Sequence, residues 1–134
     1  MLFSLAPSDL DLCARTIALM DDSASDQVRA SLAWMIRNRL TYAASSSKEL
    51  PGVAAICGQI LREATGRGDA AGPRKPLFPR ADWCRFYAVT CHVWAGDIMD
   101  ETDGATFCHR HDRAPIWARN RAPTALIGSY LFFR

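Results

Sequence analysis

Carboxylic acids at two turns are the side chains of this sequence that could donate a proton in a reaction. Asp21 and Asp22 stand in "MDDSA", directly after an apolar run, and Glu101 and Asp103 precede "GATFCH". A positioned carboxyl group can protonate a leaving group and take a proton back afterwards, which is general acid–base catalysis. Asp and Glu are also common in solvated turns. Each position therefore has a structural interpretation beside the catalytic one.

Cysteine and histidine residues form a second group with possible chemistry. The motifs "CHVW" and "CHRH" contain Cys91, His92, Cys108, His109 and His111. Structural zinc sites favour Cys or His pairs separated by about two to four residues. A single residue separates His109 from His111, and Cys91 and His92 point to different faces of a helix. The spacing argues against zinc, so we expect no metal site here.

The elements that must position these residues are mostly helices. The spacing of apolar residues predicts helices over 7–20, 25–43, 51–62 and 82–95. Ser8 is the expected cap of the first helix, and Ser25 or Asp26 that of the second. Residues 63–82 are rich in Gly, Pro and basic residues, which is typical of an irregular surface loop.

The C-terminal third has a weaker, β-like pattern. "GATFCHRH" and "ALIGSYLFFR" carry β-branched and aromatic residues, and they could pair as a small hairpin across "DRAPIWARNRAP". A chain of 134 residues suits one domain. The expected fold is therefore mainly α (α+β), one domain over 1–134 with a small C-terminal β-hairpin.

Composition excludes several classes of protein. Hydrophobic residues make up 49 % and charged residues 22 %, which is typical of a folded globular chain. A net charge of +2 is too small to argue for nucleic acid. The N-terminus has no signal-peptide pattern, and no apolar stretch is long enough to span a bilayer. We therefore expect a cytoplasmic chain, with five cysteines that act mainly as small buried hydrophobic residues.

Several segments, taken in order, resemble the SleB-type cell wall hydrolases. "GATFCH", "PIWAR" and "IGSYLFFR" are similar to the closing part of that family, and "ARTIA" and "WMIRNRL" to its first two helices. The resemblance implies a lysozyme-like domain that cleaves peptidoglycan glycan strands, often as a lytic transglycosylase, without metal or cofactor. Such an enzyme depends on one carboxylic acid, because the same group acts first as acid and then as base.

The family carries that acid as a Glu at the end of its first helix, in a motif similar to Glu-Ala-Arg-Gly-Glu. Counting from Ala14-Arg15 or back from Asn38-Arg39 places this Glu on Met20. A thioether cannot donate a proton. Loss of general acid–base catalysis lowers the reaction rate by a factor of roughly 100 to 10,000, so the resemblance implies weak activity or none.

The resemblance also suggests which residues line the groove. Asp21 is the candidate substitute acid, although one helical step of about 100° would turn it away from the groove unless the last turn is distorted. Glu101 and Asp103 are further acids near the groove, and His109 and Trp117 could contact sugar rings. Tyr130 stands where the family often has a His.

Two functions of different classes follow. The first is a degenerate domain, weakly active or inactive, that binds glycan strands or a partner protein, such as a component of a phage-like particle or envelope assembly. The second is an active cell wall hydrolase that uses a substitute acid such as Asp21. Without a signal peptide, either one would need another system to deliver it to the cell wall.

Overall fold

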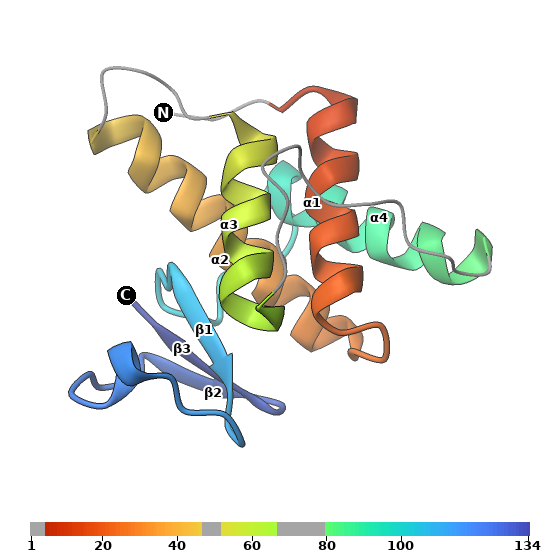
Figure 1. The fold of residues 1–134 in the computed structure, drawn as a ribbon. Helices are drawn as coiled ribbons and strands as arrows, with labels where there is room; N and C mark the ends of the chain where they lie inside the picture. The colour runs from red at the N-terminus through yellow and green to blue at the C-terminus, as the bar shows by residue number, and fades with distance from the viewer. Residues whose placement is uncertain (1–4, 47–51, 67–79) are drawn as a thin grey trace.

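The computed structural model describes residues 5–46, 52–66 and 80–134 of the chain. Helices form most of it, and a three-stranded antiparallel sheet follows them (Figure 1). In chain order the elements are α1 (Pro7–Met20), α2 (Asp26–Ser46), α3 (Val53–Thr65), α4 (Arg80–Ala95), β1 (Phe107–Arg110), the 3-10 helix η1 (Ile116–Ala118), β2 (Ala125–Ile127) and β3 (Tyr130–Phe133). The expected fold class, mainly α with a small C-terminal β part, is confirmed.

The hydrophobic core lies among the four helices and extends to the sheet through Ile127, Tyr130 and Phe132. α1 packs against α3 and α4, and α2 packs against α4, because each helix carries apolar residues at a spacing of three or four. α1 and α3 run side by side in the same direction, so that the C-terminal ends of both face the sheet (Figure 1). The largest side chains with less than 2 % exposure include Ile17, Leu32, Met35, Ile36, Phe86 and Phe132.

The helix starts agree only partly with the sequence. α1 begins at Pro7 with Ala6 as its N-cap and no side-chain cap bond, so Ser8 lies inside the helix and the prediction of a Ser8 cap is wrong. Proline suits this first position because its fixed φ matches a helix and its missing N–H would have no partner there. For α2, the Ser25 hydroxyl accepts a hydrogen bond from the Val28 N–H at 3.3 Å, as expected of a cap.

α3 is longer than the sequence suggests. It continues through Glu63 and Ala64 to Thr65, three residues that the sequence analysis assigned to a loop. Gly66, at φ 73°, ends it, because glycine adopts the left-handed conformation that closes a helix without strain. α4 likewise begins two residues early, at Arg80. Pro51 and residues 67–79 lie outside the described residues.

The predicted strands pair, and the second segment supplies two strands rather than one. β3 is the middle strand, with β1 on one side and β2 on the other. β2 and β3 form a hairpin with Ile127 opposite Tyr130, so the turn contains only Gly128 and Ser129. Gly128 has φ 57°, and two-residue hairpin turns need a positive φ that favours glycine.

Polar groups tie the sheet to α2. The Asn38 amide donates to Asp100 Oδ2 at 3.0 Å and to the Ala105 carbonyl at 3.1 Å, while Arg39 Nε donates to the Thr106 carbonyl at 2.8 Å. Asp100 also accepts bonds from the backbone N–H groups of Thr102 and Gly104. The Asn-Arg pair at the middle of α2 thus sets where β1 begins.

Candidate functional site

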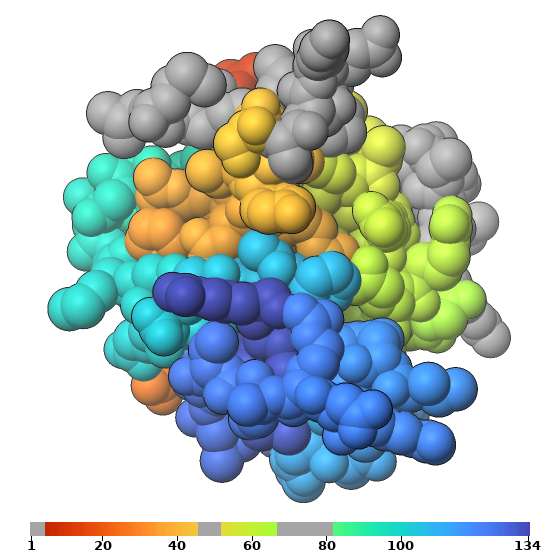
Figure 2. Space-filling view, turned by 90° about the vertical axis from the view of Figure 1, so that its left-hand side faces the viewer, coloured from red at the N-terminus to blue at the C-terminus, as the bar shows by residue number. Residues whose placement is uncertain are grey.

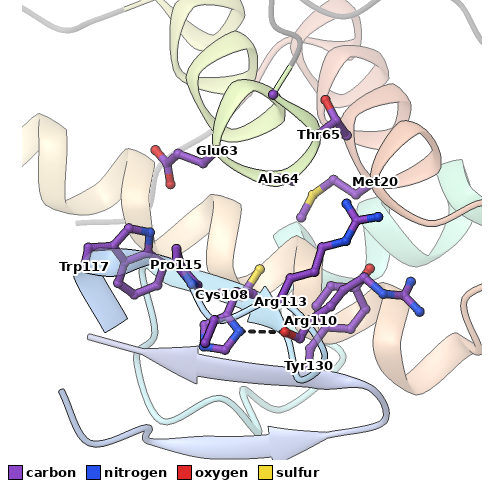
Figure 3. Close-up of a pocket in the computed structure, with 13 residues that line it drawn as sticks. Met20, Glu63, Ala64, Thr65, Cys108, Arg110, Arg113, Pro115, Trp117 and Tyr130 are labelled. Atoms are coloured by element: carbon purple, nitrogen blue, oxygen red, sulfur yellow. Dashed lines mark hydrogen bonds between the residues drawn. The ribbon is translucent and has the colours of Figure 1, made fainter. Parts of the chain in front are cut away.

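A groove of about 370 Å³ lies between the helix ends and the sheet. On the helical side it is bounded by the last residue of α1 and the last turn of α3, and on the other side by β1, β3 and the segment after β1 (Figure 3). We call it the groove. Its lining residues are Met20, Glu63, Ala64, Thr65, Gly66, Cys108, His109, Arg110, Arg113, Ala114, Pro115, Trp117 and Tyr130.

Met20 occupies the end of α1 in this groove. Its side chain is half-buried, packs against the edge of the core and extends into the space between the helices and the sheet (Figure 3). The position has the features that would suit a general acid: it is partly shielded from water, and it lies at the negative end of a helix dipole, which disfavours a charged carboxylate. The residue there is a thioether without a transferable proton.

Asp21 lies just behind the groove. α1 ends at Met20, and the Asp21 backbone is extended at φ −158° and ψ 96°, so its side chain does not follow the helical direction. The carboxylate is 13 % exposed. Its Oδ1 accepts bonds from the backbone N–H and hydroxyl of Ser23 at 3.2 and 3.1 Å, while its Oδ2 accepts the Tyr130 hydroxyl at 3.3 Å. Asp21 does not itself line the groove, but its partner Tyr130 does.

Tyr130 and Arg110 connect Asp21 with the groove. Burial raises the pKa of the Tyr130 phenol, and the Asp21 charge raises it further, so the hydroxyl stays protonated and donates to the carboxylate. The Arg110 guanidinium lies 3.8 Å from Asp21 Oδ2. The Asp21 carboxylate therefore accepts a hydrogen bond from a hydroxyl donor and lies near a cation.

Glu63 is a groove residue that the sequence analysis missed. Arg39 forms a bidentate ion pair with Glu63, with Nη1 to Oε2 at 2.8 Å and Nη2 to Oε1 at 2.9 Å. Both oxygens are thus hydrogen-bond acceptors, which does not suit a proton donor. The signal that could have placed Glu63 on a helix was Gly66, because glycine commonly follows the last helical turn.

An aromatic wall closes the sheet side of the groove. The Trp117 indole meets the Phe133 ring edge to face at 5.2 Å, and the His109 imidazole stacks on Phe133 at 5.3 Å. His109 Nδ1 is 2.7 Å from the Arg110 carbonyl oxygen. A carbonyl can only accept, so Nδ1 carries the proton and Nε2 of the neutral ring is an acceptor. The structure brings His109, Trp117 and Tyr130 together in the lining of the groove.

The other two predicted acids lie elsewhere. Glu101 accepts a bond from the Gln27 amide at 2.8 Å, and Asp103 is 3.5 Å from Arg134 Nη2. Neither lines the groove. Within the described part of the chain, no three Cys, His, Asp or Glu side chains come together as they would around a metal ion. No helix in that part is both long and apolar enough to cross a membrane.

These features define a mainly α domain of lysozyme-like architecture with its groove between the helix ends and a small sheet. Among solved structures, one with this architecture is the catalytic domain of the Bacillus cereus SleB protein, with a TM-score of 0.67. The match covers 98 % of this chain and 93 % of that one at 18 % sequence identity, which establishes a common fold. No protein-family model and no curated protein matches the chain.

Proposed function

We propose that this chain is a glycan-binding domain with a SleB-type fold that cleaves peptidoglycan strands weakly or not at all. The observation that supports the proposal is Met20, a thioether that ends α1 and lines the groove at the position where the sequence resemblance implies a general acid. Asp21 follows Met20 in the chain and Glu63 lines the same groove, and both carboxylates accept hydrogen bonds from neighbouring donors. Among the described residues, the lining of the groove thus contains hydrogen-bond acceptors and cations but no carboxylic acid without a hydrogen-bonding donor beside it.

Its walls suit a sugar polymer. Trp117 offers an aromatic surface on which the apolar face of a sugar ring can stack, and His109 and Arg113 offer polar groups for hydroxyl and acetamido substituents. The groove is open along the boundary between helices and sheet, where an extended strand could lie. We therefore place its site of action at the cell wall.

The test is a paired assay on purified peptidoglycan. Co-sedimentation measures binding, and mass spectrometry of the supernatant measures cleavage and separates hydrolysis from anhydro-sugar formation. We expect the protein in the pellet and few soluble products. Efficient release of glycan fragments by the wild-type protein would contradict the proposal.

A second candidate is an active hydrolase with Asp21 as its acid. It is favoured by the extended backbone after Met20, which turns the Asp21 carboxylate toward Tyr130 and the groove. If Asp21 is the acid, wild-type cleavage should be measurable and Asp21→Asn should abolish it. Asp22→Asn is the matched control, because Asp22 is the next residue and is exposed.

A further inference from the structure

A second cavity, of about 620 Å³, lies on the far side of the Arg39–Glu63 ion pair. Glu63 lines the groove, and its partner Arg39 lines this cavity. The boundary between α2 and α3 on one side and the C-terminal segments on the other runs across the face shown in Figure 2. We call this space the arginine cavity. It is lined by Arg39, Tyr42, Gln59, Gly104, Thr106, Phe107, Arg121 and Arg134.

The guanidinium groups of this cavity are held in place before any ligand arrives. Arg39 lies over the Phe107 ring at 4.3 Å, and Arg121 lies 5.4 Å from the same ring. Arg121 Nη2 also donates to the Arg134 carbonyl, and Arg134 Nε to the Asp103 carbonyl at 2.9 Å. A guanidinium has five N–H donors, so these contacts fix each group and leave further donors for a ligand.

The lining of the cavity is rich in cationic side chains. No Asp or Glu side chain is among its lining residues in the described part of the chain. Glu63 neutralises Arg39 from behind, while Asp103 is mostly exposed and 3.5 Å from Arg134, so water screens that pair. Arg121 donates to the main-chain oxygen of Arg134 and keeps further N–H donors. Three guanidinium groups thus face one space, and planar guanidinium groups suit carboxylates.

We propose that the arginine cavity binds the carboxylates of the stem peptides that branch from a peptidoglycan strand lying in the groove. This inference rests on the proposed glycan binding. The two spaces are neighbours, because the Phe107 ring of the cavity contacts the Trp117 ring of the groove at 5.5 Å. A strand whose sugar rings stack on Trp117 can therefore place a peptide branch beside Arg121.

The experiment compares three soluble probes by calorimetry with the full chain. They are glycan fragments with free-acid stem peptides, the same fragments with these carboxylates converted to amides, and the free stem peptide alone. We expect amidation to weaken binding about ten-fold or more, since hydrogen bonds to charged groups are the strong ones. Binding of the free-acid fragments should also weaken as salt is raised.

Variants then locate the effect. Arg121→Gln should reduce the affinity for free-acid fragments to that for amidated ones, and Arg121→Lys, which keeps the charge, should lose less. Arg85→Gln is the matched control, because Arg85 is exposed on α4 and lines neither space. Melting temperatures measured alongside exclude unfolding as the cause.

The outcomes separate this inference from the proposed function. Equal wild-type affinity for free-acid and amidated fragments, or equal losses in Arg121→Gln and Arg85→Gln, overturns the peptide subsite and leaves glycan binding intact. Binding of the free peptide without any binding of the amidated fragments, which keep the glycan, supports the subsite and contradicts the proposed function. Absence of binding to every probe contradicts both.

Discussion

At the scale of single residues, the property that matters most is whether the side chain at position 20 can donate a proton to a bound ligand. Met20→Glu places a carboxyl group at the negative end of the α1 dipole in a half-buried position, which favours its protonated form. Arg110 and Arg113 line the same groove and oppose this by favouring the charged form. We expect peptidoglycan cleavage to rise by a factor of about 100, measured as soluble products over time.

Met20→Gln is the control for that substitution, because it has the same shape as Glu and no acid. Both variants put a polar group where a thioether packed, so each should lose roughly 1–3 kcal/mol of stability. Cleavage by Glu but not by Gln would assign the gain to proton donation. A folded but inert Met20→Glu would mean that an acid at position 20 is not sufficient for cleavage in this groove.

Sequence reasoning placed Met20, His109, Trp117 and Tyr130 near one another, because the resemblance supplied their order along known elements. It did not find Glu63, which local composition assigned to a Gly-rich loop. Nor did it find that Asp21 bonds Tyr130, 109 residues away along the chain. Such contacts depend on where the end of α1 lies relative to the sheet, and local sequence patterns do not predict that placement.

At the scale of elements, the turn between β2 and β3 packs so closely against α2 that one added side-chain atom would clash. A Cβ on Gly128 would lie 2.6 Å from a methyl group of Val28 on α2, and the backbone there has φ 57°. Gly128→Ala should therefore cost on the order of 2–4 kcal/mol, from backbone strain and overpacking together. Chemical denaturation measures this loss.

Gly96→Ala serves as the matched control, because Gly96 also has a positive φ, of 82°, but nothing lies within 4 Å of its added Cβ. It should cost only about 1 kcal/mol. Adding Val28→Ala should make the Gly128→Ala cost smaller than it is in the wild-type background. If the two glycine substitutions cost the same, contact between the turn and α2 does not contribute.

Asp100, in the loop before β1, should make the free energy of unfolding fall at acid pH. Burial raises the pKa of Asp100, but hydrogen bonds from Thr102, Asn38 and Gly104 outweigh it, so the pKa is lowered overall. A lowered folded pKa means that the stabilisation is present above the unfolded pKa of about 3.9 and is lost as pH falls through the folded value. Asp100→Asn should cost about 2–3 kcal/mol at pH 7 and progressively less below pH ~4.

Asp103→Asn makes the same chemical change in the same loop, and Asp103 is 74 % exposed. Its free energy of unfolding should differ little from wild type between pH 7 and 3. Urea titrations at several pH values compare the two variants. A cost of Asp100→Asn that stays constant down to pH 2 would show that its charge is not the stabilising feature.

At the scale of the whole molecule, the rate at which the cysteine thiols are alkylated can measure global unfolding. All five are free thiols, with Cys13 and Cys57 fully buried in the core and Cys84 exposed on α4. Burial raises the pKa of Cys108 to about 12, which keeps its thiol protonated at neutral pH. A native sample should alkylate quickly at Cys84 and only slowly at Cys13, Cys57 and Cys108.

In denaturant all five should react, and mass spectrometry of the intact chain counts the labels. Cys13 and Cys57 should react only when the chain unfolds, so destabilising variants such as Gly128→Ala should speed their labelling and leave that of Cys84 unchanged. Equal native rates at Cys13 and Cys84 would contradict the described packing of α1.

The fold as a whole could be predicted better than its details. The apolar spacing of α1, α2 and α4 is regular because each buries one side against its neighbours, so periodicity identified all of them. The order of strands could not be read in the same way. Whether "ALIGSYLFFR" forms one strand or two depends on Gly128 fitting against Val28, which is a tertiary contact.

The ties between α2 and the sheet have a consequence for how such a domain can evolve. Asn38, Arg39 and Asp100 hold the two parts together, and none of their hydrogen bonds involves residue 20. Natural selection can therefore act on the two sets of residues separately. A substitution at position 20 can change the chemistry of the groove while these hydrogen bonds, and the architecture that they hold, stay in place.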